Sequence, residues 1–139
     1  MKKKILIRIV GLIIAIFIFL SYNRSTNANP LKDEDVLNIK EINIFNPSEG
    51  FSYSVTKQAD INVLFKLLKS MKLDKKDYIN LDIDYIAYIK RHNGEAYAIS
   101  IYSDNVRINN QNYKSKKDYS DKIKKVFDEL SNKYPKKEM

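Results

Sequence analysis

The chain holds few of the side chains that usually carry out catalysis. Its 139 residues include no cysteine and a single histidine, His92. Histidine-based triads, cysteine nucleophiles and thiolate zinc sites therefore lack most of their parts. His92 stands beside Asn93-Gly94 and shortly before Glu95, a setting typical of a solvated turn and not of a general base held in a cleft. We expect no catalytic residue in this chain, and so no enzyme.

Carboxylates and glycines are also placed unfavourably for a metal or nucleotide site. A hard cation such as calcium binds clustered carboxylates. Four aspartates lie within residues 74–84, but they lack the glycine and spacing of a calcium loop. Phosphate-binding loops need several glycines close together, whereas residues 29–139 contain only Gly50 and Gly94, both at turns. We therefore expect no metal and no cofactor. The four aspartates are Asp74, Asp77, Asp82 and Asp84.

The formal net charge of +8 is carried mostly by the N-terminus. Five of the 25 basic residues and none of the 17 acidic ones lie in residues 1–28, which leaves a net charge of +3 for residues 29–139. A dedicated nucleic-acid binder would carry a strongly basic stripe, so we expect no nucleic-acid partner. One lysine cluster near the last predicted helix is either a solvated face or a contact for anionic lipid or wall polymer. Its members are Lys114, Lys116, Lys117, Lys122, Lys124 and Lys125.

Tyrosines give a better indication of a binding surface. The chain has ten tyrosines and no tryptophan. A tyrosine combines a large contact area with a polar tip, which suits a partner surface. Residues 83–102, which contain four of them, alternate as two strands around Asn93-Gly94. Asn-Gly is the preferred pair for a type I′ turn, because both central residues of that turn need positive φ. We therefore predict a hairpin with a two-residue turn.

A two-residue turn decides which residues of the hairpin share a face. It pairs His92 with Glu95 and, further out, Ala87 with Ser100. The bulkier face is then expected to lie against the helices: Ile86, Tyr88, Lys90, Tyr97, Ile99 and Ile101. The other face has a small, flat middle between aromatic residues. It is either a surface for a protein or peptide partner or a half-exposed sheet face. This candidate partner surface consists of Tyr85, Ala87, Ala98, Ser100 and Tyr102.

Residues 1–22 have the composition of a signal peptide or a signal anchor. A basic start precedes an uninterrupted apolar run of 12 residues, 9–20, which suits a signal peptide. Cleavage after Ala28 would then release a secreted product. The alternative is an uncleaved helix over residues 5–22 in the cytoplasmic membrane. That single-pass chain would have its N-terminus inside and its C-terminal domain outside.

The remaining residues, 36–139, are predicted to form one extracytoplasmic domain, joined to the N-terminal segment by a polar tether over residues 23–35. The apolar periodicity predicts strands and two helices in the order ββαββββα. This is an α+β fold: an antiparallel meander sheet with two helices on one face, preceded by one N-terminal apolar helix. The strands are expected at 39–45, 51–55, in the hairpin 83–102, and at 106–108 and 111–114, and the helices at 56–72 and 118–133.

The order of these segments resembles that of small exported or membrane-anchored domains of unknown function from low-GC Gram-positive bacteria, of the DUF5301-like type. The resemblance rests on the stretches IKEINIFN, TKQADINVLFKLLKS, DYIAYIKRHNGEAYAISIY and DNVRINNQNYK. It covers residues 39–130 and implies a place outside the cytoplasm and no known activity. No site residue follows from it.

Together these observations predict a non-catalytic extracytoplasmic binding module of the sensor, inhibitor or immunity type. Its body would be a monomer, and residues 5–22 would contact the cytoplasmic membrane. One alternative is a structural subunit of a membrane complex that associates through its N-terminal helix. A third possibility is an enzyme acting on cell-wall polymer, which would need two carboxylates across a pocket.

Overall fold

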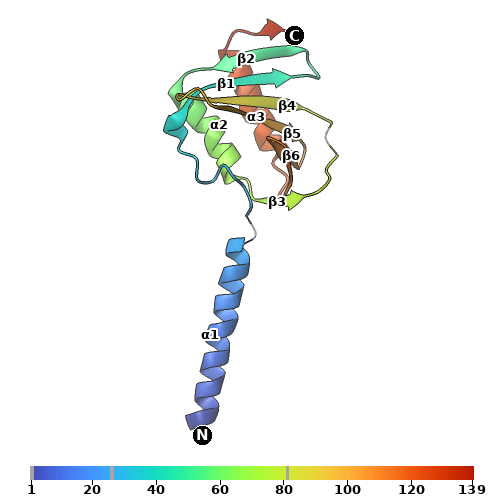
Figure 1. Ribbon diagram of the computed structural model, residues 1–139. Coiled ribbons are helices and arrows are strands. Elements are labelled where there is room, and N and C mark those ends of the chain that lie inside the picture. The colour runs from blue at the N-terminus through green and yellow to red at the C-terminus, as the bar shows by residue number, and fades with distance from the viewer. Residues whose placement is uncertain (1, 26, 81) are drawn as a thin grey trace.

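The computed structural model describes residues 2–25, 27–80 and 82–139, and it confirms the predicted α+β class. A long N-terminal helix extends away from a body of sheet and helices (Figure 1). The helices are α1 (Lys2–Ser25), α2 (Gln58–Ser70) and α3 (Ser120–Lys133), and a short 3-10 helix, η1 (Val36–Asn38), precedes the first strand. The strands are β1 (Ile39–Asn46), β2 (Phe51–Val55), β3 (Leu73–Lys76), β4 (Tyr85–Arg91), β5 (Ala96–Tyr102), β6 (Asn105–Ile108), β7 (Gln111–Ser115) and β8 (Lys137–Glu138).

The strands form one antiparallel sheet in the order β3-β7-β6-β5-β4-β1-β2-β8. Both α2 and α3 pack on the same face, which we call the inner face (Figure 1). The Tyr53 hydroxyl in β2 donates to the Phe127 carbonyl in α3 (2.9 Å), and so ties the sheet to that helix. Within the described residues, no helix covers the opposite, outer face.

Two of the eight strands lie outside the predicted pattern of six. β3 pairs with β7, and β8 pairs with the first two residues of β2. Both strands are short and charged and lie at the edges of the sheet, as is typical of edges protected against further pairing. The composition of β3 is that of a charged loop, so the apolar periodicity predicts no strand at Leu73–Lys76.

The core lies between the inner face and the two helices. Ile42 and Ile44 in β1, like Ile99 and Ile101 in β5, are at most 1% exposed because alternate strand residues point to the same side. Each helix contributes a stripe of apolar residues at a spacing of three or four. The buried stripes are Ile61, Leu64, Phe65 and Leu68 in α2, and Ile123, Phe127 and Leu130 in α3.

The turn of the central hairpin has three residues, so the predicted two-residue turn is wrong. The Arg91 N–H donates to the Glu95 carbonyl (2.8 Å), and the Gly94 N–H donates to the Arg91 carbonyl (3.1 Å). Only Gly94 has a positive φ, of 90°, and Asn93 does not. The Asn93 side chain instead accepts a hydrogen bond from the Glu95 N–H (3.0 Å). The register therefore shifts by one residue: Ala87 lies opposite Ile99 and not Ser100.

The segment assigned to a tether joins the packed body from Asn27 onward. The Ala28 N–H donates to the Leu73 carbonyl in β3 (2.8 Å). Asn29 is fully buried, and its side-chain amide donates to the carbonyls of Leu68 (2.9 Å) and Met71 (2.8 Å) at the end of α2. The last carbonyls of a helix have no partner within the helix. Asn29 supplies one, and thereby fixes the segment to α2.

The first helix stands apart from this packing. All side chains of residues 2–20 are exposed, so none of them contributes to the core. Thirteen large apolar residues between Ile5 and Leu20 are among these exposed residues. Of the helices in the described residues, none has both the length and the apolar character needed to cross a membrane.

Candidate functional site

The structure divides the predicted partner surface between the two faces of the sheet. Tyr85 and Ala87 lie on the inner face, where Ala87 is fully buried and the Tyr85 ring lies 4.4 Å from a phenylalanine ring of α3. Ala98, Ser100 and Tyr102 lie half-buried on the outer face. The one-residue shift explains this division, because it turns the residues of β4 over relative to those of β5. These five residues therefore do not form one surface.

Other side chains lie beside Ala98, Ser100 and Tyr102 on the outer face. Tyr88 is opposite Ala98, and Ile86 is opposite Ser100. The next strand, β1, adds a phenylalanine whose ring meets that of Tyr88 edge to face, with centroids 5.3 Å apart. Tyr88 keeps 42% of its surface exposed. We call this set the outer-face patch: Phe45, Ile86, Tyr88, Ala98, Ser100 and Tyr102.

Polar side chains border the outer-face patch. Lys90 and Glu41 form an ion pair of 3.5 Å across β4 and β1. On the other side, Arg107 Nε donates to Asn112 Oδ1 (2.8 Å) across β6 and β7. An aromatic centre within a polar rim is the usual arrangement of a protein–protein interface. The outer-face patch is thus suited chemically to a protein partner.

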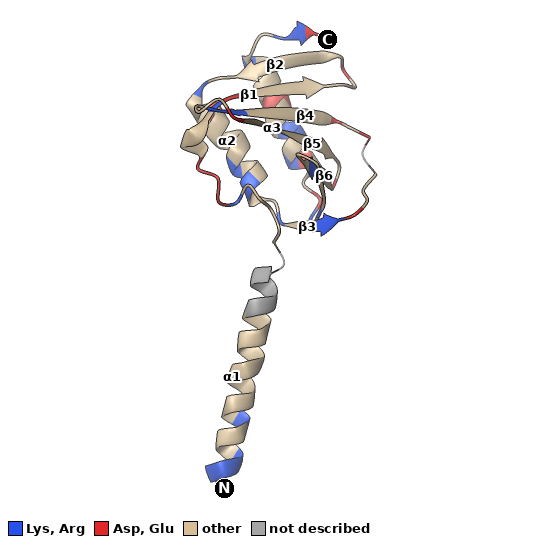
Figure 2. Cartoon of the chain, in the orientation of Figure 1, with Lys and Arg blue, Asp and Glu red and all other residues tan. Residues whose placement is uncertain are grey.

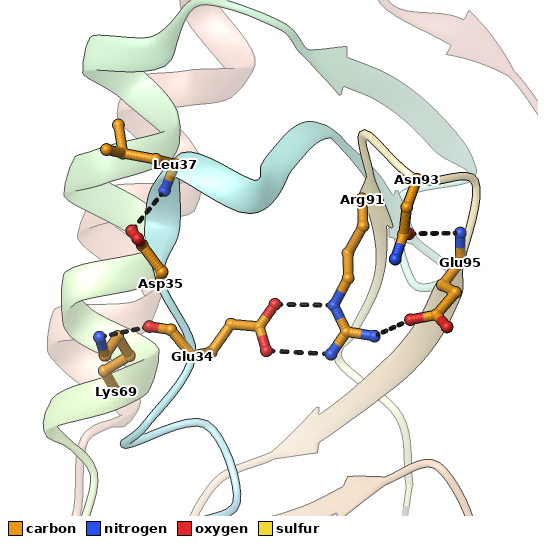
Figure 3. Close-up of polar contacts among 7 residues, drawn as sticks. All are labelled: Glu34, Asp35, Leu37, Lys69, Arg91, Asn93 and Glu95. Atoms are coloured by element: carbon orange, nitrogen blue, oxygen red, sulfur yellow. Dashed lines mark hydrogen bonds and ion pairs between the residues drawn. The ribbon is translucent and has the colours of Figure 1, made fainter.

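A cavity of about 660 Å³ lies at the hairpin end of the inner face, between residues 30–34 and strands β5 to β7. Arg91 is part of its charged lining, and Figure 3 shows the contacts of this residue with Glu34 and Glu95. Its Nε and Nη2 donate to the Glu34 carboxylate (2.7 and 2.9 Å), and its Nη1 donates to Glu95 (2.9 Å). The guanidinium carbon also lies 4.8 Å from the centre of the Tyr97 ring.

This charged cluster acts as a clamp rather than as a ligand site. The hydrogen bonds to Glu34 raise the pKa of Arg91 above its usual value. All three guanidinium nitrogens already bind a carboxylate, so the group is neutralised and offers little to an anionic ligand. The Glu34–Arg91 clamp joins the segment after α1 to a hairpin 57 residues later. No feature of the sequence indicates this pair.

Tyr97 lines the same cavity, and its hydroxyl is a poor general base. Its hydroxyl is shielded from solvent and has no hydrogen-bond partner in the part of the chain that is described. Burial raises the pKa of Tyr97 further above neutrality. The phenol therefore stays protonated and cannot act as a general base.

The remaining polar candidates are engaged in ordinary surface contacts. The exposed His92 donates its backbone N–H to the Asn38 carbonyl (2.9 Å). Asp74 pairs with Lys116 (3.6 Å), and Lys124 of the predicted lysine cluster pairs with Asp128 (2.7 Å). Among the described residues, no three histidine or acidic side chains are grouped as ligands for a metal ion.

Comparisons with known protein families, with curated proteins and with solved structures gave no match. The resemblance to DUF5301-like domains therefore stays a prediction.

Proposed function

We propose that the chain is a non-catalytic extracytoplasmic binding module whose outer-face patch takes a protein or peptide partner. The observation that carries this proposal is that, in the part of the chain that the structure describes, helices cover only one face of the sheet. The open face presents adjoining aromatic and apolar side chains, which favour burial by a partner. The flat middle at Ala98 and Ser100 suits an equally flat protein surface. A small molecule would need a concave pocket.

We place the body outside the cytoplasm. The basic residues Lys2, Lys3 and Lys4 precede the apolar run, and this order favours a cytoplasmic N-terminus. Exposed apolar side chains on all sides of α1 favour an apolar environment for that helix. The proposal covers a body anchored at the cytoplasmic membrane and, if the segment is cleaved, a secreted one. Protease added to intact protoplasts should digest residues 30–139, and protection of the body would contradict this location.

A second candidate function is that of a structural subunit that binds its complex through α1. The exposed apolar surface of residues 5–20 favours this alternative, because a neighbouring helix would cover it. The outer-face patch would then face solvent in the assembled complex. We propose no catalytic activity for either case.

Photo-crosslinking tests the binding module. Tyr88 and Tyr78 are both exposed tyrosines, at 42% and 83%, but only Tyr88 belongs to the outer-face patch. A photoreactive phenylalanine at position 88 should give a defined adduct in intact cells, and one at position 78 should not. The Ser100→Arg variant should abolish that adduct by placing a charge in the flat middle. Equal adducts from both positions would rule out the patch as the site.

Exchange of α1 separates the two candidates. In one variant, an unrelated apolar helix replaces residues 1–25 ahead of an unchanged body. The adduct at position 88 should persist if the body binds the partner. Loss of the adduct would instead support the structural subunit that associates through α1.

A further inference from the structure

One end of the body is held close to α1. The helix ends at Ser25, and Asn27, two residues later, already accepts a hydrogen bond from the Leu73 N–H (3.3 Å). Two residues span at most about 7 Å. The apolar run of α1 ends at Leu20, five helical residues or about 7.5 Å before Ser25. This end of the body therefore lies within about 15 Å of the apolar part of α1.

Lysine side chains gather at this same end. Figure 2 shows basic segments at β3 and at the end of α2, around the point where α1 joins the body. Lys32 Nζ donates to the Asn27 carbonyl (3.3 Å), and this lysine and two of α2 line a hollow of about 520 Å³. The backbone N–H of Lys116 donates to the Lys72 carbonyl (2.9 Å) beside β3. We call this set the basic collar: Lys32, Lys66, Lys69, Lys72 and Lys116.

The positive charge of the basic collar is only partly neutralised. Asp74 pairs with Lys116 at 3.6 Å, and Asp33 follows Lys32 in the chain. With these two aspartates counted, the collar retains a net charge of +3. The adjoining strand β3 adds two more lysines, Lys75 and Lys76, so the end of the body near α1 carries an excess of positive charge.

We propose that the basic collar docks on a lipid surface that carries anionic headgroups. This inference rests on the proposed function, because α1 must bring the collar to the lipid. The headgroup layer extends about 5–7 Å beyond the apolar core of a bilayer. At most about 8–10 Å of the roughly 15 Å then separates this end of the body from the headgroups, which is about one Debye length at moderate ionic strength. Each lysine near an anionic surface contributes about fivefold to association.

Docking of the collar orients the body on the membrane. The Ala28–Leu73 hydrogen bond places β3 next to the point where α1 joins, and β3 is one edge of the sheet. The β3 edge would therefore face the lipid, and β8 would lie farthest from it. The outer-face patch, on β1, β4 and β5 in the middle of the sheet, stays accessible to a partner.

Site-specific quenching in vesicles tests this orientation. The full chain has no cysteine, so one introduced cysteine carries one fluorophore. Ser70→Cys labels the basic collar, and Glu138→Cys labels β8 at the opposite edge. Each chain is reconstituted in phosphatidylcholine alone and in an equal mixture with phosphatidylglycerol, both containing a nitroxide headgroup quencher. We expect quenching at position 70 to be several-fold stronger in the mixture and to fall with salt. Quenching at position 138 should be weak in both.

Matched charge variants show whether the collar is responsible. Lys66→Gln with Lys72→Gln should remove most of the effect of phosphatidylglycerol at position 70, because two lysines contribute about 25-fold to association. Lys40→Gln with Lys137→Gln removes the same charge from β1 and β8 and should leave the effect unchanged. Equal losses in both double variants would overturn the proposal.

Flotation distinguishes failure of this inference from failure of the proposed location. A chain that floats with neither kind of vesicle overturns both. A chain that floats with both, but whose label at position 70 is quenched equally in both, overturns the docking alone. Tighter binding of soluble poly(glycerol phosphate) than of the mixed vesicles would assign the collar to a wall polymer and also overturn it.

Discussion

Two buried tyrosines differ in whether their hydroxyl groups have a hydrogen-bond partner. The Tyr53 hydroxyl donates to the Phe127 carbonyl (2.9 Å), whereas the Tyr97 hydroxyl has no partner among the described residues. A buried hydrogen bond is worth about 1 kcal/mol, and a buried polar group without one carries a penalty of about 1–3 kcal/mol. We expect Tyr53→Phe to lower the free energy of unfolding and Tyr97→Phe to raise it, each by about 1 kcal/mol. Urea denaturation measures both changes, and a loss of stability in Tyr97→Phe would contradict the prediction.

The register of the hairpin predicts which of its side chains stabilise the fold. Ile99→Ala removes a fully buried side chain and should cost about 2–5 kcal/mol. Tyr85→Ala should cost a similar amount, because its ring packs on α3. Tyr88 and Tyr102 lie on the outer face. Tyr88→Ala and Tyr102→Ala should therefore lower the free energy of unfolding clearly less, while they reduce partner binding. Thermal unfolding of the four variants checks this order. If Tyr88→Ala destabilises as much as Tyr85→Ala, the outer face is buried.

At the scale of elements, the two strands of the hairpin differ in how well their sequences predict their faces. In β5, Ile99 and Ile101 alternate with small or polar residues, so the buried face follows from the pattern. In β4, both faces carry apolar residues, since Ile86 and Tyr88 alternate with Ala87 and Ile89. Only the turn could then decide the face, and Asn-Gly is compatible with both a two-residue and a three-residue turn. The prediction consequently placed the three residues of β5 on the correct face of the sheet and the two residues of β4 on the wrong one.

One ionised carboxylate adds a polar contact between the start of α2 and the end of α3. Asp60 at the start of α2 accepts hydrogen bonds from the Tyr134 hydroxyl (2.7 Å) and Lys133 Nζ (2.9 Å) at the end of α3. These hydrogen bonds, that of Tyr134 first, lower the pKa of Asp60. A lowered pKa in the folded state means that the stabilisation is present above the unfolded value and is lost as the pH falls through the folded one.

Asp60→Asn should therefore destabilise the body at neutral pH. The difference in free energy of unfolding between the native chain and this variant should begin to shrink below about pH 4, where the carboxylate of the unfolded chain becomes protonated, and should continue to shrink as the pH falls through the lowered pKa of the folded state. Chemical denaturation at a series of pH values measures it. A matched variant, Asp121→Asn in the first turn of α3, lies outside this contact and controls for general charge effects. A constant difference between pH 7 and pH 3 would contradict the assignment.

At the scale of the whole molecule, contacts between distant segments were the least predictable feature. Glu34 and Arg91 lie 57 residues apart, and Asn29 reaches Met71 across 42 residues. The sequence does not show whether a polar residue is exposed to solvent or buried with a hydrogen-bond partner. Residues 27–35 are rich in polar groups, and this composition led to the prediction of a tether. The structure shows that these residues are bonded to β3, to α2 and to the hairpin.

These contacts bear on processing of the N-terminal segment. Cleavage after Ala28 would make the buried Asn29 the first residue. It would remove the hydrogen bond from the Ala28 N–H to Leu73 and the one from the Leu73 N–H to the Asn27 side chain. It would also remove the hydrogen bond from the Asn29 N–H to Asn27 Oδ1 (3.1 Å) and place a charged amine at that position. A folded product is therefore not expected to begin at Asn29.

We expect the mature chain in cells to retain the Ala28–Asn29 bond. Peptide mapping of the purified native protein should recover a fragment that spans residues 27–31. In vitro, a body that begins at Asn27 should unfold at a higher urea concentration than one that begins at Asn29, because only the first keeps the contacts to Leu73. The matched control is Asn27→Ala in the longer body, which removes the side-chain acceptor but leaves Ala28 in place, and should show an intermediate midpoint. Equal midpoints for the two bodies, or a native N-terminus at Asn29, would show that this segment is not an integral part of the fold.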